Sequence, residues 1–241
     1  MVGNVRCATE SGSHRPPQTR QRVPWLVCLA GCLIALGGVP IRAAEPATIT
    51  FSLDFPNSEP EHYSISVQSD GHAHYECLAR ISDDSDDRET YQTDFVLADA
   101  TRARIFDLAA QAGYFSGKID SGNKKLAFTG AKKLAYRDDK RNSVADYNFS
   151  SQPAVQQLTA LFQSVAATLE FGRRLAHFHH YQKLALDEEL KRMEEEARRG
   201  ELAELQAVRP VLQEIFDDPS VINVVRARAQ RIMEVGTATG R

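Results

Sequence analysis

The chain has 241 residues, with 29 lysine and arginine and 32 aspartate and glutamate side chains, and a formal net charge of −3 at pH 7. This length suits one sizeable domain or a small domain with an appendage. An acidic chain is repelled by nucleic acid and by anionic lipid surfaces. The composition therefore argues against both classes of partner.

Residues 1–44 are predicted to be an export signal. Their centre is the apolar run Trp25–Val39, which is shorter than the roughly twenty residues that a helix needs to cross a bilayer. Positive residues precede this run and small residues follow it, at Arg15, Arg20, Arg22, Ala43 and Ala44. We therefore expect a periplasmic or secreted protein with no transmembrane span once the signal is removed.

A lipid anchor is the alternative. The run Leu29-Ala30-Gly31-Cys32 resembles a bacterial lipobox, and lipidation of Cys32 would hold the protein in the cell envelope. Leu33–Val39 is still apolar, however, whereas a lipoprotein usually continues into a short polar tether. This favours ordinary cleavage near Ala43 or Ala44, and membrane anchoring is expected only if Cys32 is lipidated.

Removal of the leader changes the chemistry of the chain. The leader carries five arginines and one glutamate, so 24 basic and 31 acidic residues remain, a net charge of −7. Three cysteines leave with it, and Cys77 is then the single cysteine. An intrachain disulfide is excluded. We interpret Cys77 as a buried small apolar side chain, with an intermolecular disulfide or a reactive thiol as the alternative.

The first part of the remaining chain reads as strands. Residues 48–55 alternate polar and apolar side chains, which is typical of a strand with one buried face. The segments 63–67 and 72–77 form a hairpin pattern around Gly71. A three-residue loop with Gly71 in the left-handed conformation keeps one face apolar. The predicted pairs are Val67 with Ala73, Ile65 with Tyr75, and Tyr63 with Cys77.

An acidic loop at 83–87 and a strand at 91–96 come next. We then expect a helix at 100–112, capped by Asp99 and ended by Gly113. Two further strands are predicted at 132–137 and 143–149, the second with Phe149 on its buried face.

From Pro153 the apolar residues recur at helical spacing. Further helices are expected over 175–199, 201–208, 210–216 and 219–235, separated by Gly172, Gly200, Pro210 and Pro219. The predicted fold is α+β: a small antiparallel sheet with covering helices, followed by a helical C-terminal extension. The predicted parts are a signal peptide at 1–44, a sheet-and-helix module at 45–171 and the helical extension at 172–241.

One resemblance covers about residues 61–169. The pattern Tyr63-x-Ile-x-Val-x-x-Asp-Gly-x-x-x-Tyr75, a helix ending in Ala-Gly-Tyr-Phe115, a later hairpin and the Gln156-Gln-Leu158 helix are similar to an uncharacterised family of small bacterial exported domains. The resemblance implies an exported sheet-and-helix module, and it implies no catalytic residue.

Two histidine clusters are candidate metal sites. His72 and His74 lie two apart on a predicted strand and so project from one face, with Glu76 next along. His177 and His180 lie one turn apart on a predicted helix, where they could hold a metal or respond to pH. Neither set supplies enough ligands alone. The favoured interpretation is solvated side chains for the strand pair and packing between helices for the helix pair.

No catalytic or cofactor-binding residue is marked by the sequence, which lacks a Gly-x-Ser-x-Gly elbow, a phosphate loop and a dinucleotide fingerprint.

The amphipathic stretch 175–199 indicates either a partner-binding or self-associating helix or packing among the C-terminal helices. Arg226, Arg228 and Arg231 are expected to pair with the acidic helices. We therefore expect an exported noncatalytic binding module without a cofactor, the alternative being a metal-dependent or hydrolytic enzyme that uses a histidine cluster.

Overall fold

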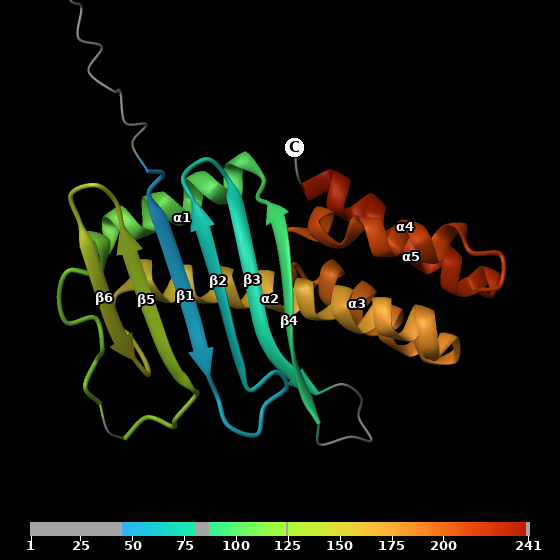
Figure 1. The fold of residues 1–241 in the computed structure, drawn as a ribbon, viewed down its shortest axis with the longest axis horizontal. Coiled ribbons are helices and arrows are strands. Elements are labelled where there is room, and N and C mark those ends of the chain that lie inside the picture. Colours follow the sequence, from blue (N-terminus) through green and yellow to red (C-terminus); the bar gives the residue numbers. More distant parts are fainter. Residues whose placement is uncertain (1–44, 81–86, 124, 240–241) are drawn as a thin grey trace, which may run out of the picture. The chain divides into compact units, whose positions relative to one another are not determined.

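A six-stranded antiparallel sheet is the centre of the fold (Figure 1). The computed structural model describes residues 45–80, 87–123 and 125–239, which belong to one compact unit spanning 43–241. The predicted leader with Cys32, and all of the predicted acidic loop except Asp87, lie outside these ranges. The spatial order of the strands is β4-β3-β2-β1-β5-β6. Their bounds are β1 Thr48–Asp54, β2 His62–Gln68, β3 His72–Arg80, β4 Arg88–Val96, β5 Ala131–Arg137 and β6 Asn142–Tyr147.

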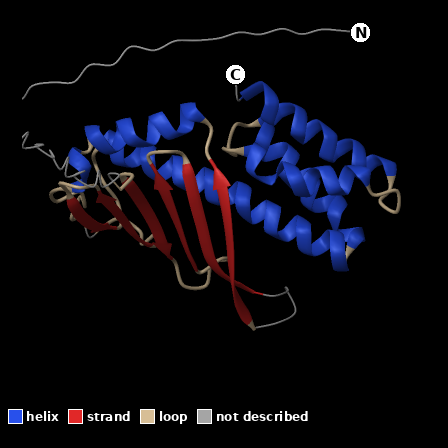
Figure 2. Ribbon diagram, turned by 45° about the horizontal axis from the view of Figure 1, so that its top comes forward, coloured by secondary structure: helices blue, strands red, loops and turns tan. Residues whose placement is uncertain are grey.

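Helices cover one face of this sheet and then continue beyond it (Figure 2). The α-helices are α1 Asp99–Gln111, α2 Pro153–Tyr181, α3 Leu186–Arg198, α4 Arg209–Asp217 and α5 Asn223–Thr239, and short 3-10 turns are η1 Gly113–Phe115, η2 Lys183–Ala185 and η3 Leu205–Val208. The predicted α+β class with a helical C-terminal region is therefore confirmed. Within the described ranges, no helix is long and apolar enough to span a membrane.

The predicted β2–β3 hairpin is confirmed residue by residue. Val67 pairs with Ala73, Ile65 with Tyr75 and Tyr63 with Cys77. Gly71 has φ of 98°, which a side chain would strain, and its N–H donates to Gln68 across the loop. The inward residues of both strands are buried. The burial of one face thus selects the register.

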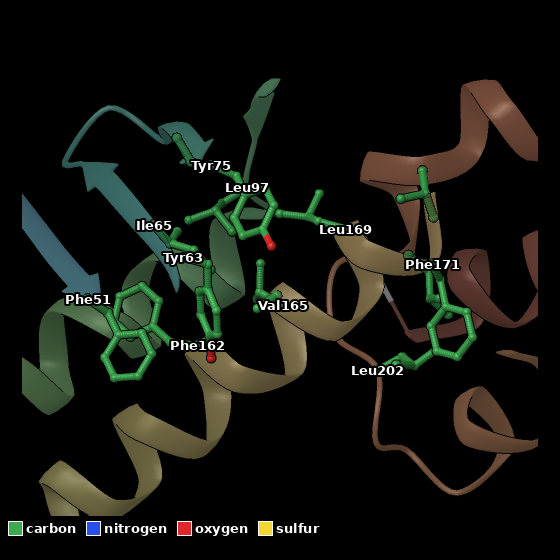
Figure 3. Packing of buried hydrophobic residues seen from close by; sticks show 14 of the residues in the cluster. Phe51, Tyr63, Ile65, Tyr75, Leu97, Phe162, Val165, Leu169, Phe171 and Leu202 are labelled. Carbon is green, nitrogen blue, oxygen red and sulfur yellow. The ribbon is translucent and has the colours of Figure 1, made fainter. Parts of the chain in front are cut away.

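The core lies between the sheet and helices α1 and α2 (Figure 3). Phe51 of β1 stacks on Phe162 of α2, with ring centroids 5.3 Å apart and planes 4° from parallel. Val165 and Leu169 continue the same side of α2 against the sheet. Burial of such side chains contributes about 1.5–3 kcal/mol each.

Two elements within the predicted module have bounds that differ from the prediction, the last strand and helix α1. The last strand ends at Tyr147, and Phe149, expected in the buried face, is 42% exposed. The backbone leaves the sheet because the 120–121 segment takes its hydrogen bonds: Asn148 N–H donates to Asp120 and Ser121 N–H donates to Phe149 O. Helix α1 begins one residue early, so Asp99 lies in its first turn and pairs with Arg102 instead of capping it.

The predicted helix break at Gly172 was also wrong. Helix α2 runs unbroken through Gly172 to Tyr181 and therefore belongs both to the sheet layer and to the helical region. A Cβ atom at Gly172 would lie 2.5 Å from Val208 Cγ1, so glycine here allows η3 to approach closely. The predicted helix at 201–208 is only the short turn η3, which follows Glu204 in the left-handed conformation.

Candidate functional site

The first predicted histidine cluster lies on the open face of the sheet. His74 Nδ1 is 2.7 Å from Asp94 Oδ1 on β4, and Glu76 accepts a hydrogen bond from Gln92 on the same strand. The backbone N–H of His72 donates to Asp70, while its side chain is exposed. These side chains share a face, as predicted, but His74 and Glu76 pair with β4 rather than with each other.

The second predicted cluster lies on the last turns of α2. The rings of His177 and His180 lie 5.0 and 4.4 Å from the ring of Tyr181, whereas His179 reaches a carboxylate, with Nε2 2.9 Å from Asp218 Oδ2. Sequence spacing missed His179 because its partner is 39 positions away. In the parts of the chain that the structure describes, no group of three or more His, Cys, Asp or Glu side chains could hold a metal ion.

Asp218, which follows α4, is hydrogen-bonded to residues at the end of α2 and in η2. Its carboxylate accepts hydrogen bonds from Lys183 Nζ at 2.6 Å and from both the backbone N–H and the hydroxyl of Ser220. Lys183, then Ser220 and then His179 hold the pKa of Asp218 well below its usual value. The α2–η2 connection is thereby fixed to the connection between α4 and α5.

Cys77 belongs to a buried polar network that the sequence did not predict. Glu170 of α2, 4% exposed, accepts hydrogen bonds from Tyr75 Oη at 2.7 Å and from Cys77 Sγ at 3.2 Å. Arg173 Nε donates to its other oxygen at 3.0 Å. Burial, together with the nearby Glu170 charge, raises the pKa of the Cys77 thiol to about 12. The thiol is therefore protonated at neutral pH, and the expectation of a buried cysteine holds.

One signal in the sequence could have located this network. Glu170 lies between two buried apolar residues of α2, Leu169 and Phe171, and two arginines follow it at one-turn spacing. A carboxylate in an apolar stretch with arginines three and four residues later is typical of a buried ion pair. Its partners Tyr75 and Cys77 depend on how the sheet meets the helix, and local spacing contains no information on that.

A buried lysine lies at the other end of the module. Lys132 is 6% exposed, and its ammonium donates to Thr129 O, Thr129 Oγ1 and Asn148 O at 2.9–3.0 Å. Burial lowers its pKa. The same side chain lines a cavity of about 570 Å³ together with Tyr147 and Phe149. Because backbone oxygens surround the ammonium, its role in the structure is to fix the turn at 129–130 to the end of β6.

The C-terminal helices pack on one another through an apolar core and a buried carboxylate. The apolar side of the predicted amphipathic stretch is buried on α3, at Leu186, Leu190, Met193 and Ala197. This confirms the interpretation that these side chains pack among the C-terminal helices. Glu194 accepts hydrogen bonds from Arg228 and Arg231, as predicted for those arginines. Arg226 differs, because it donates to the backbone oxygen of Phe216.

The far end of the helical region exposes large apolar side chains. We call Tyr181, Leu184, Ile222 and Val224 the distal apolar cluster; their exposed fractions are 71%, 96%, 61% and 51%. The first two lie at the α2–η2 connection and the others at the start of α5. The Lys183–Asp218 ion pair joins these two segments. This end lies beyond β4, the edge strand of the sheet (Figure 1).

Comparison with known proteins adds no further assignment: the chain matches no protein-family model and no curated protein.

Proposed function

We propose that this chain is an exported, noncatalytic binding protein that acts through contacts of its surface with another protein. The observation that carries the proposal is the distal apolar cluster. Leu184 is almost fully exposed, although burial of a leucine side chain is worth about 1.5–3 kcal/mol. Grouped apolar side chains on a surface are typical of protein interaction sites.

The anchoring of this cluster supports the same function. Asp218, Lys183 and Ser220 hold the two connections that carry the apolar side chains. A surface that is already ordered loses less conformational entropy when it binds a partner. The helical region thus presents a prearranged contact surface at a distance from the sheet.

Site-specific photo-crosslinking in the producing cells tests this function. A photoreactive phenylalanine derivative replaces Leu184 in the full-length chain, and the matched control replaces Lys191, which is exposed on α3. We expect a discrete crosslinked protein from position 184 and none from position 191. The absence of an adduct at 184, or the same adducts from both positions, would contradict the proposal.

Export is part of the proposal and has its own test. Mass spectrometry of the native protein is expected to find an N-terminus within 43–45, after removal of the predicted leader. A mature chain that begins with a lipidated Cys32 would replace the periplasmic or secreted location with an envelope anchor. An unprocessed N-terminus in the cytoplasm would contradict export.

A further inference from the structure

The strand β4 is an open edge of the sheet. It is one of the two outermost strands, has nine residues and contains no proline, and most of its side chains are exposed. Alternate residues of an edge strand direct their backbone N–H and C=O groups away from the sheet. Such an edge has the hydrogen-bonding chemistry to accept one more strand.

The sheet-facing side of α2 continues past this edge. Along α2 the buried residues Phe162, Val165 and Leu169 face the sheet, and Arg173 follows at the same spacing and contacts the backbone oxygen of Arg80, the last residue of β3. The next positions on this side of the helix are Ala176 and His180, and both are exposed. From Arg173 to Tyr181 the helix extends about 12 Å, enough to cover about two strands.

We propose that β4 accepts an extended segment of a partner protein as a seventh, antiparallel strand, whose inward side chains pack against Ala176 and His180. The proposal rests on the proposed binding function and names its partner chemistry. Main-chain hydrogen bonds supply affinity in this mode, and alternate side chains supply specificity. The helix past β4 gives the added strand a surface on which to bury one face.

A second copy of the chain does not fit this edge. Antiparallel pairing of two β4 strands about a twofold axis perpendicular to the sheet would place both helical layers on the same side of one continuous sheet. Each copy's α2 and α3 extend past β4, so the two overhangs would occupy the same space (Figures 1 and 2). A single extended segment avoids this clash.

Charge on β4 defines the partner further. Glu89 and Asp94 are exposed carboxylates at opposite ends of the strand. Register with β3 places Glu89 on the helix side and Asp94 on the open side, because Glu89 pairs with buried Ala79 and Asp94 with His74. The expected segment therefore has small apolar residues facing inward and one basic residue near each end.

A synthetic peptide tests the proposal. The probe is Thr-Val-Lys-Val-Thr-Val-Thr-Lys-Thr, which places a lysine opposite each carboxylate in an antiparallel pairing. We expect saturable binding by fluorescence anisotropy and slower hydrogen exchange at the amides of β4. A peptide with the same side chains and N-methylated central amides is expected not to bind, because it lacks the donors.

Two matched variants distinguish peptide binding at this site from nonspecific binding. Ala176→Glu puts a charge under the added strand and is expected to weaken binding at least about tenfold. Ala160→Glu makes the same change at another exposed position of α2 and is expected to leave binding unchanged. Both alanines are exposed, so neither change removes a buried contact within the fold.

Four outcomes would overturn the added strand: no binding of the probe up to about 1 mM, equal binding of the N-methylated peptide, protection away from β4, or equal affinity of Ala176→Glu. A crosslinked partner at Leu184 in any of these cases would leave the binding function standing. The two proposals therefore fail separately.

Discussion

At the scale of single residues, Glu170 is the side chain on which most depends. It is a buried carboxylate whose two oxygens accept hydrogen bonds from Tyr75, Cys77 and Arg173. Glu170→Gln removes the buried charge that is hydrogen-bonded to Arg173, so we expect a loss of about 2–4 kcal/mol in the free energy of unfolding. Urea unfolding measures it.

Glu195→Gln is the matched control, because Glu195 is exposed on α3, and its effect is expected to stay within about 0.5 kcal/mol. The Cys77 thiol gives a second readout. A protonated, buried thiol reacts slowly, and the Gln variant is expected to label faster with a thiol reagent. Equal stability of the two variants would show that the network contributes nothing.

Asp218 gives a dependence on pH. Its pKa is lower in the folded protein than the ordinary value of 3.8, so the contribution of Asp218 to stability is present above about pH 4 and is lost as the pH falls below it. We expect Asp218→Asn to lower the Tm at about pH 7 and to match the wild type more closely at about pH 2.5. Asp217→Asn, at the exposed neighbouring carboxylate, is the matched control.

At the scale of elements, the local sequence pattern was sufficient to predict strand pairing where one face of the strands is buried. The β2–β3 register could be predicted because any shift mixes polar and apolar residues, and because Gly71 permits the positive φ of the loop. The end of the last strand could not be predicted. Phe149 fits the alternation, but the segment at 120–121 takes over its backbone hydrogen bond.

The histidines show the same limit at the candidate site. Spacing selected His177 and His180, which are one turn apart, and overlooked His179, whose partner Asp218 is supplied by the connection after α4. Spacing within one helix shows which side chains share a face. It cannot show which face meets a distant segment, and that meeting decides which histidine finds a carboxylate.

At Gly172 a contact between α2 and the distant turn η3 opposes local helix propensity, which gives a testable prediction. Alanine favours a helix over glycine by about 1 kcal/mol, so local propensity alone predicts that Gly172→Ala stabilises the protein. The Cβ atom would meet Val208 Cγ1 at 2.5 Å, and overpacking costs about 1–3 kcal/mol. We expect net destabilisation in urea unfolding, partly recovered by Gly172→Ala with Val208→Ala. A more stable single variant would mean that η3 moves away freely.

At the scale of the whole molecule, α2 connects the sheet layer with the helical region, because it packs on both. Its first half packs on the sheet through Phe162, and its second half, from Phe171, packs on the C-terminal helices (Figure 3). A second link is independent of α2, since the carboxylate of Glu204 accepts a hydrogen bond from Ala98 N–H at 2.8 Å. Neither region can lose its structure without exposing apolar surface of the helix they share.

We therefore expect the predicted parts at 45–171 and 172–241 to unfold together. In hydrogen-exchange mass spectrometry over a urea series, peptides from β1 and from α3 should lose protection with the same unfolding free energy and the same urea dependence. Because both regions pack on one continuous helix, opening of either exposes the core of the other. Loss of protection in α3 at lower urea than in β1 would mean that the helical region opens alone, and the contact surface at its far end would then be ordered independently of the sheet.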